Sequence, residues 1–186
     1  DYALYPPGTP VRSYTEEQAE AAEGLIFETA QRLEHPEVPN LPPDASAQTY
    51  IQSLAPGESA LLAGAAGPGA IYRFTTRISG PDAPQNLREC LLEMTFDGEK
   101  QPQVQAPLGD FFGTVPGLNP FTSLPAGVSE DGLMYSHWVM PYRRDAEIRV
   151  TNTGGDVVTL SGQVFTAPYA WTPNTMHFHA KWRTED

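Results

Sequence analysis

The chain begins with helical spacing and changes to strand spacing near residue 47. Residues 15–34 carry apolar side chains at steps of three and four, which is the spacing of one helix face: Ala19, Ala22, Ile26, Ala30 and Leu33. Thr15 and Gln18 have the spacing of a capping box, and Pro36 is expected to end the helix. The pattern therefore predicts one α-helix, whose apolar face packs on its own sandwich or on a neighbouring chain.

Two segments without periodicity flank this helix. Residues 1–14 contain three prolines and predict an extended N-terminal arm, which is ordered only where something holds it. Residues 35–47, HPEVPNLPPDASA, predict a Pro-rich linker that crosses the surface.

From residue 48 onward, short apolar runs with a period of two alternate with turn residues. We expect eight or nine strands here, near residues 48–54, 58–64, 70–79, 88–97, 101–106, 133–142, 146–152, 156–166 and 175–183. Short strands punctuated by Gly and Pro predict an all-β fold, a jelly-roll β-sandwich over residues 48–186. The segment 109–132 is its longest predicted loop, and long loops on a β-scaffold are where binding residues tend to lie.

The strand near 88–97 leads into the most specific part of the sequence. Leu92, Met94 and Phe96 alternate with polar residues, so one face of the strand is expected in the core. Asp97-Gly98 then gives a strong hairpin signal. The loop that follows the returning strand, GDFFG at residues 109–113, sets two adjacent aromatic residues beside a carboxylate, and at least one ring is expected at the surface.

The composition agrees with one β-rich core and argues against nucleic acid and anionic membranes as partners. Of 186 residues, 40% are hydrophobic and 18% charged, and 19 prolines and 16 glycines supply many turns. With 11 basic and 23 acidic residues, the formal charge is −12, which repels nucleic acid and anionic membranes. No run of about 20 apolar residues could span a bilayer. Cys90 is alone and is expected to be a buried, inert thiol.

These features do not determine the cellular compartment of the protein. A single cysteine excludes an internal disulfide and so gives no sign of an oxidising environment. The chain begins at Asp1 without Met, as it would after removal of a leader, so a secreted or extracellular location is slightly favoured.

Four segments, taken in order, resemble glycoside hydrolase family 172, the family of difructose-anhydride and α-D-fructofuranoside enzymes and of D-arabinan-degrading relatives. They are GPGAIYR at 67–73, FDGE through GDFFG at 96–113, MPYR at 140–143 and HFHA at 177–180, within residues 55–182. The resemblance implies the first of two consecutive jelly rolls and a furanoside substrate. In this family both catalytic glutamates lie in motifs of the second jelly roll, and this chain ends at Asp186 before any such motif.

The resemblance places the GDFFG loop toward the active-site end of the domain. Asp110, Phe111 and Phe112 are therefore candidate carbohydrate-binding residues, with Arg73 from a second matched segment. The alternative for Asp110 is a structural turn in which its side chain bonds its own backbone. Arg73 and Arg143 could each clamp a carboxylate of a substrate or of the protein, and a salt bridge within the fold is favoured for both.

Histidines and aromatic residues suggest two further interpretations. His177 and His179 would share one face of a strand and could bind a metal with His137, although a hydrogen-bonded structural role is favoured, so we expect no metal or other cofactor. The three tryptophans could stack on sugar rings or pack in the core, and packing is favoured: Trp138, Trp171 and Trp182.

Three functions remain open. The chain is the first jelly roll of a furanoside-acting glycoside hydrolase, inactive without a second half that supplies both glutamates; no catalytic residue is expected within it. Alternatively it is a non-catalytic carbohydrate-binding module. The third possibility is a structural jelly roll that assembles into rings, shells or filaments, as a homo-oligomer joined through the N-terminal arm.

Overall fold

A computed structural model describes residues 5–10 and 14–183, and the chain divides into two compact units, residues 1–35 and 36–186. The first unit is helical, with α1 at Glu16–Ala21 and α2 at Glu23–Glu34. Within the described residues no helix is long and apolar enough to cross a membrane. The part of the predicted arm that is described, residues 5–10 and 14, contains no helix or strand; residues 1–4 and 11–13 lie outside the described residues.

The expectation of one continuous helix over residues 15–34 was wrong. The predicted cap is present, because the Thr15 side chain accepts a hydrogen bond from the Gln18 backbone N–H. The helix is interrupted at Ala22, whose φ of −99° and ψ of 1° are not helical, and α2 then continues to Glu34. Pro36 follows two residues later, where its ring prevents continuation.

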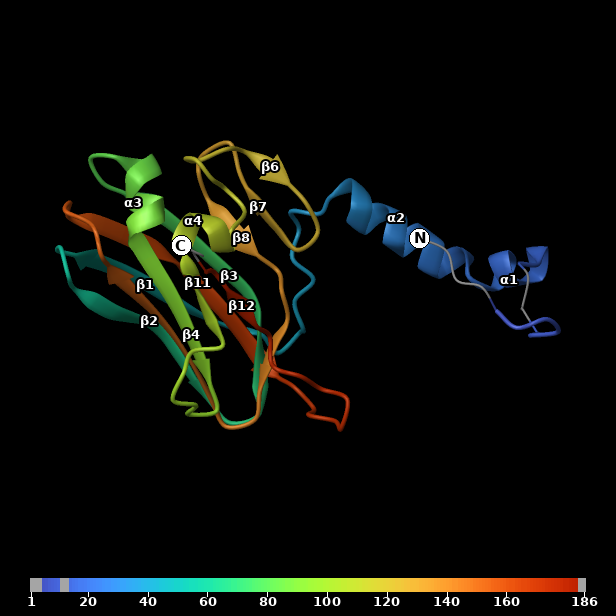
Figure 1. The fold of residues 1–186 in the computed structure, drawn as a ribbon. Coiled ribbons are helices and arrows are strands. Elements are labelled where there is room, and N and C mark those ends of the chain that lie inside the picture. Colours follow the sequence, from blue (N-terminus) through green and yellow to red (C-terminus); the bar gives the residue numbers. More distant parts are fainter. Residues whose placement is uncertain (1–4, 11–13, 184–186) are drawn as a thin grey trace. The chain divides into compact units, whose positions relative to one another are not determined.

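The second unit is a sandwich of two sheets (Figure 1). The larger sheet has the order β1-β11-β3-β8-β7-β6, and β9 also pairs with β3. The bounds of its strands are β1 Ser46–Leu54, β3 Gly69–Ser79, β6 Phe121–Thr122, β7 Ala126–Val128, β8 Met134–Ser136, β9 Met140–Tyr142 and β11 Val158–Pro168. The smaller sheet has the order β12-β5-β4-β10-β2. Its strands are β2 Ser59–Ala66, β4 Cys90–Phe96, β5 Val104–Pro107, β10 Asp145–Asn152 and β12 Ala180–Lys181.

The strand order confirms the predicted all-β sandwich and its jelly-roll topology. Along the chain, β1, β3, β8 and β11 belong to the larger sheet, while β2, β4, β5 and β10 belong to the smaller one. The first and last of these strands, β1 and β11, are neighbours, and β2 pairs with β10 next to β4. Chain ends that return beside each other in this nested order are the signature of two Greek keys wound into a jelly roll.

The core lies between the sheets and is built by the alternation seen in the sequence. Leu92, Met94 and Phe96 of β4 are fully buried, as the period-two pattern predicts, and Phe74 of β3 faces them from the larger sheet. Cys90 is buried as well, and burial raises the pKa of its thiol to about 11, so the thiol form dominates.

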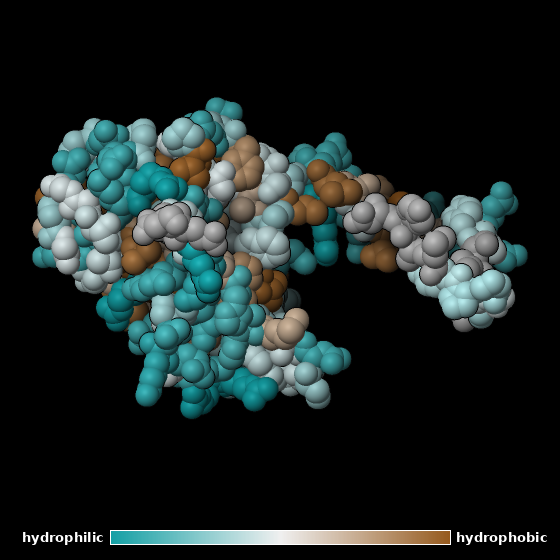
Figure 2. All heavy atoms as spheres, viewed as in Figure 1, coloured by the Kyte–Doolittle hydropathy of each residue, from teal (hydrophilic) through white to brown (hydrophobic). Residues whose placement is uncertain are grey.

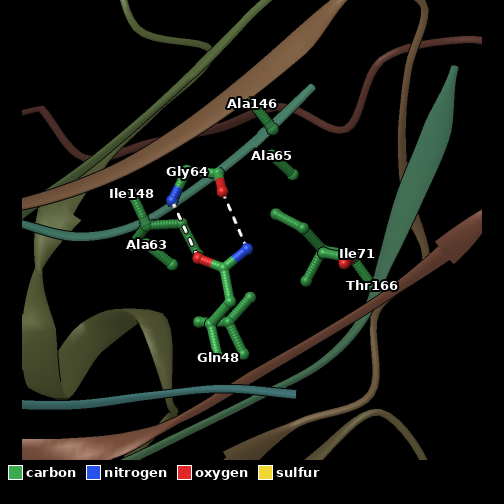
Figure 3. Close-up of a pocket in the computed structure, with 9 residues that line it drawn as sticks. Gln48, Ala63, Gly64, Ala65, Ile71, Ala146, Ile148 and Thr166 are labelled. Carbon is green, nitrogen blue, oxygen red and sulfur yellow. Dashed lines mark hydrogen bonds between the residues drawn. The ribbon is translucent and has the colours of Figure 1, made fainter. Parts of the chain in front are cut away.

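One side chain links the open edges of the two sheets. Figure 3 shows the Gln48 amide from β1 bonded in both directions to Gly64 of β2. Its Nε2 donates to the Gly64 carbonyl at 2.8 Å, and its Oε1 accepts from the Gly64 amide at 3.3 Å. The apolar cavity beside it measures about 10 Å³, too small for any organic ligand.

Several elements differ from the expected strand list. The predicted long loop at 109–132 contains β6 and β7, which extend the larger sheet. Two short helices were not predicted: α3 at Ala83–Glu89, capped by Asp82, and α4 at Leu108–Phe111. The segment expected as a strand at 175–183 is irregular except for β12, whose two residues pair in parallel with β5.

The placement of Phe112 gives a direct test of the core. Its side chain is 0% exposed and its ring centroid lies 5.2 Å from that of Phe74. We expect Phe112→Ala to destabilise the domain by about 3–5 kcal/mol in urea denaturation, because the cavity cannot close fully. Trp138→Ala, at a side chain that is 44% exposed, is the control and should cost less than about 1 kcal/mol. Equal losses in the two variants would contradict this packing.

Candidate functional site

The predicted Asp97-Gly98 turn is present and positions the first part of the candidate site. Asp97 has a φ of 60° and Gly98 a φ of 65°, the pair of positive values that a type I′ turn requires. Glu99 N donates to Phe96 O at 3.2 Å and closes the turn. Asp is among the few side chains that tolerate this backbone region, and Gly has no Cβ to oppose it.

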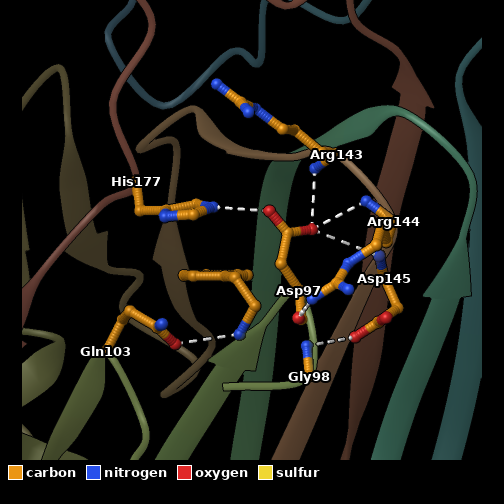
Figure 4. A network of polar contacts seen from close by, with 8 residues as sticks. Asp97, Gly98, Gln103, Arg143, Arg144, Asp145 and His177 are labelled. Atoms are coloured by element: carbon orange, nitrogen blue, oxygen red, sulfur yellow. Dashed lines mark hydrogen bonds and ion pairs between the residues drawn. The ribbon is translucent and has the colours of Figure 1, made fainter.

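The Asp97 carboxylate accepts hydrogen bonds on both oxygens (Figure 4). Its Oδ1 accepts from the backbone amides of Arg143 at 2.8 Å, Arg144 at 2.7 Å and Asp145 at 3.4 Å, which connect β9 to β10. Its Oδ2 lies 2.8 Å from Nε2 of His177. The side chain is only 9% exposed, so this anion is held by the protein and hardly by water.

These hydrogen bonds determine the protonation state of Asp97. Burial alone would raise the pKa of this carboxyl group, since it disfavours the charged form. The backbone amides of residues 143–145 and the His177 side chain act in the opposite direction and lower the pKa below its ordinary value. Asp97 is therefore ionised at neutral pH.

His177, which bonds Asp97, also lines an open pocket of about 770 Å³, here called the Arg143 pocket. The His177 ring stacks on Phe96 with centroids 5.9 Å apart and lies 5.0 Å from the Trp171 ring. The Arg143 guanidinium lies 4.5 Å from the centroid of the same Trp171 ring. The pocket is lined by Asp97, Glu99, Arg143, Trp171, His177 and His179, with three further residues.

A second pocket, of about 480 Å³, lies around Asp110 and is called the Asp110 pocket. Its aromatic wall includes Trp138 and Phe178, with ring centroids 5.6 Å apart, and Trp182. Trp138 is 44% exposed and Trp182 42% exposed, so both present ring surface to solvent. Asp110 forms an ion pair with Arg88 of α3, and that guanidinium lies 5.6 Å from the Trp182 centroid.

Local packing explains why the GDFFG segment forms a helical turn and not an open loop. α4 begins directly after β5, with Pro107 in the cap position. A Cβ at Gly109 would lie 2.9 Å from the Thr114 carbonyl oxygen, so only glycine allows this close return of the chain. The turn directs Asp110 and Phe111 toward the pocket and Phe112 into the core.

The structure brings together two of the four predicted sugar-binding residues. Asp110 and Phe111 both line the Asp110 pocket. Phe112 is a correction to the expected set, because its ring is fully buried and cannot contact a ligand from solvent. The alternative in which Asp110 bonds its own backbone is also not what the structure has, since its carboxylate pairs with Arg88.

Arg73 lies elsewhere, on the outer face of the larger sheet. A bulge in β3 lets Phe165 pair with Arg73 and Thr166 with Ile71, which turns Arg73 away from the core. Its guanidinium lies 5.9 Å from the Phe165 ring centroid, and burial lowers its pKa. Arg73 does not line the Asp110 pocket, so it cannot share a ligand with Asp110 there.

The histidines do not form the expected pair on one strand face. His177 lies before β12 and bonds Asp97, and His179 lines both pockets. His137 stacks on Tyr135 at 4.8 Å, and its pKa is lowered by burial and by Arg73. Among the described residues no three His, Cys, Asp or Glu side chains come together in a way that could hold a metal ion.

Sequence reasoning did not identify the Asp97–His177 contact or the stacking of Arg143 on Trp171. The Asp97-Gly98 turn and the MPYR segment were both visible as motifs, but the residues that join are 80 positions apart. The only signal for this arrangement was that Asp97, Arg143 and His177 all lie in segments already singled out.

Fold and site together define a jelly-roll domain with two neighbouring surface pockets lined by aromatic, carboxylate and histidine side chains. The family model described as GH172 domain-like matches residues 44–164, and the chain belongs to this family. The match includes three of the four segments named above; the HFHA segment lies beyond its end. No curated protein matches the chain.

The Asp97 network predicts a pH-dependent stability difference. Asp97→Asn keeps the shape and tolerates positive φ, but it loses the charge-assisted hydrogen bonds, so we expect a loss of about 1–3 kcal/mol at pH 7. Because the folded-state pKa is lowered, this stabilisation is present above the ordinary carboxyl pKa and is lost as pH falls through the lowered value. The two proteins should approach each other below about pH 4 in urea denaturation.

Glu99→Gln is the control for this measurement, because Glu99 is the last residue of the turn and its exposed side chain bonds no neighbour among the described residues. Its stability should match that of the original chain within about 0.5 kcal/mol. A constant difference for Asp97→Asn across the pH range would remove the ionised carboxylate as its cause.

Proposed function

We propose that this chain is the first jelly-roll domain of a furanoside-acting glycoside hydrolase and binds the furanoside in the Asp110 pocket. The observation that carries the proposal is the placement of the family's GDFFG segment at a surface pocket with exposed aromatic rings. Asp110 accepts hydrogen bonds from sugar hydroxyls, and the ring faces of Trp138 and Trp182 cover the apolar side of the sugar.

The ion pair with Arg88 supports this role for Asp110. A carboxylate has four lone-pair positions, so pairing one oxygen with Arg88 fixes its orientation and leaves acceptor capacity for a ligand. Arg88 is itself held over Trp182, so the two sides of the pocket are linked. Such prior positioning lowers the entropy cost of binding.

We propose that neither Asp97 nor Asp110 serves as the general acid of a glycosidase. A general acid must keep its proton near neutral pH, which requires a raised pKa. Asp97 has a lowered pKa and accepts hydrogen bonds on both oxygens, and one oxygen of Asp110 is occupied by the Arg88 guanidinium, which a proton donor to a leaving group would have to give up. We therefore propose that the catalytic glutamates come from a second domain, and that this domain alone binds without hydrolysis.

Binding is tested by titrating the ¹⁵N-labelled chain with methyl arabinofuranoside and methyl fructofuranoside, with methyl glucopyranoside as the control ligand. We expect the furanosides to shift the indole signals of Trp138 and Trp182. Asp110→Asn should weaken binding by about tenfold, the loss of one charge-assisted hydrogen bond. Asp131→Asn is the matched control, since Asp131 pairs with Arg77 away from the pocket, and it should leave the affinity unchanged.

The same preparation tests the absence of chemistry. We expect no release of nitrophenol from nitrophenyl furanosides by the isolated chain above the rate in buffer. Turnover that survives purification and is abolished by a substitution in this chain would contradict the proposal. Furanoside binding that is equal in Asp110→Asn and Asp131→Asn would remove the Asp110 pocket from the site.

A second candidate function is assembly through the helical unit, and exposed apolar side chains on α2 favour it. Figure 2 shows brown, apolar residues along this helix, and they include Leu25, Ile26, Phe27 and Leu33, each at least 56% exposed. Apolar groups gathered on one short helix mark an interaction surface more often than scattered ones do.

We expect the full chain to sediment as a homo-oligomer and a variant that lacks residues 1–35 to sediment as a smaller species with its β-sheet circular dichroism intact. Phe27→Ser should reduce the oligomer, whereas Ile51→Ser, at a β1 side chain that is 73% exposed, should not. A full chain that sediments at 20.3 kDa would contradict assembly.

A further inference from the structure

The Arg143 pocket contains a cation that has a backbone contact and a stacking contact. The backbone N–H of Arg143 is held on Asp97 at 2.8 Å, and Figure 4 shows its side chain extending away from that carboxylate. The guanidinium stacks over Trp171 with a distance of 4.5 Å to the ring centroid. Stacking uses one flat face of the group and leaves its N–H donors, which lie in the plane, for other partners.

Arg143 has no anionic partner among the described residues, although acidic residues outnumber basic ones by 23 to 11 in the chain. The arginine–carboxylate ion pairs among the described residues join other arginines to carboxylates: Arg77 to Asp131, Arg88 to Asp110 and Arg149 to Glu147. Asp97 lines the same pocket, but its oxygens already accept from three amides and face His177. The donors of Arg143 are therefore not used by the nearest buried carboxylate.

We propose that the Arg143 pocket binds a sugar acid, a small polyhydroxylated molecule with one carboxylate, whose two oxygens accept a bidentate pair of hydrogen bonds from Arg143. Glu99 and His179 line the same pocket, and neither side chain bonds another described residue, so both are available to sugar hydroxyls. The volume of about 770 Å³ is in the range of ordinary small-molecule sites. The Arg143 pocket shares only His179 with the lining of the Asp110 pocket, and this proposal does not rest on the furanoside proposal.

Charge selects a single carboxylate over a phosphate ester. The charged residues that line the pocket are two arginines, Arg143 and Arg144, and two acids, Asp97 and Glu99, so their formal charges cancel. A doubly charged phosphate would enter a balanced pocket on a chain with a formal charge of −12 and would be repelled by Glu99. A carboxylate carries one negative charge and has the planar geometry that a bidentate contact with the Arg143 guanidinium requires.

The experiment compares two ligands that differ only in the carboxylate, D-glucuronate and D-glucose, titrated into the ¹⁵N-labelled full chain at pH 7 and low salt. We expect glucuronate to shift the Gly98 and Arg144 amides and the Trp171 indole, and to bind at least about tenfold more tightly than glucose. Arg143→Gln should reduce glucuronate affinity to the glucose level. We expect the variant to fold, because the Asp97 network uses only the backbone amide of Arg143.

Glu99→Gln should have the opposite effect and raise glucuronate affinity severalfold, since it removes a like charge from the pocket. Arg149→Gln and Glu147→Gln are the matched controls, because they make the same charge changes in an exposed ion pair on β10. Both should leave glucuronate binding within about twofold. Equal affinity for glucose and glucuronate, or equal losses in Arg143→Gln and Arg149→Gln, would overturn the proposal.

Discussion

The Asp97 carboxylate is the contact on which the candidate sites depend. It joins the turn after β4 to the connection between β9 and β10, and through His177 it holds the segment that precedes β12. The turn between β2 and β3 is attached to the same place, because Gly67 N donates to the Arg144 carbonyl at 2.7 Å. One buried anion therefore joins three segments that are distant in sequence, and the lowered pKa follows from the same bonds. The β2–β3 turn is the fourth segment at this place, and it is attached through the Arg144 backbone.

Both pockets share the segment 177–182, which has almost no regular structure of its own. His177 enters the Arg143 pocket, Phe178 enters the Asp110 pocket, and His179 borders both. The segment is held at one end by Asp97 and at the other by the short pairing of β12 with β5, where Trp182 N donates to Gln105 O at 3.0 Å. One irregular segment, held at both ends, thus contributes residues to two neighbouring pockets.

The sequence predicted the parts of the fold that follow from local patterns. The period of two in β4, the Asp97-Gly98 turn and the cap at Thr15 each depend on neighbouring residues, and each is present. The family resemblance also located Asp110 and Phe111 at a pocket. The features that the sequence did not predict depend on contacts between residues that are distant along the chain. The helical turn of α4 sends Phe112 inward, and a bulge in β3 turns Arg73 to the outer face of the larger sheet.

The same physical reasoning separates structural from functional carboxylates. Asp97 is the most deeply held carboxylate of the two pockets and, beside a histidine, resembles half of a catalytic dyad. A catalytic acid, however, requires an environment that favours its neutral form, and three backbone amides favour the charged form. Asp97 is thus an anchor that orders the pocket walls, while Asp110 and Arg143, at half-open sites with donor or acceptor capacity left, are the groups suited to ligands. Both proposals therefore assign ligand recognition to these two groups and a structural role to Asp97.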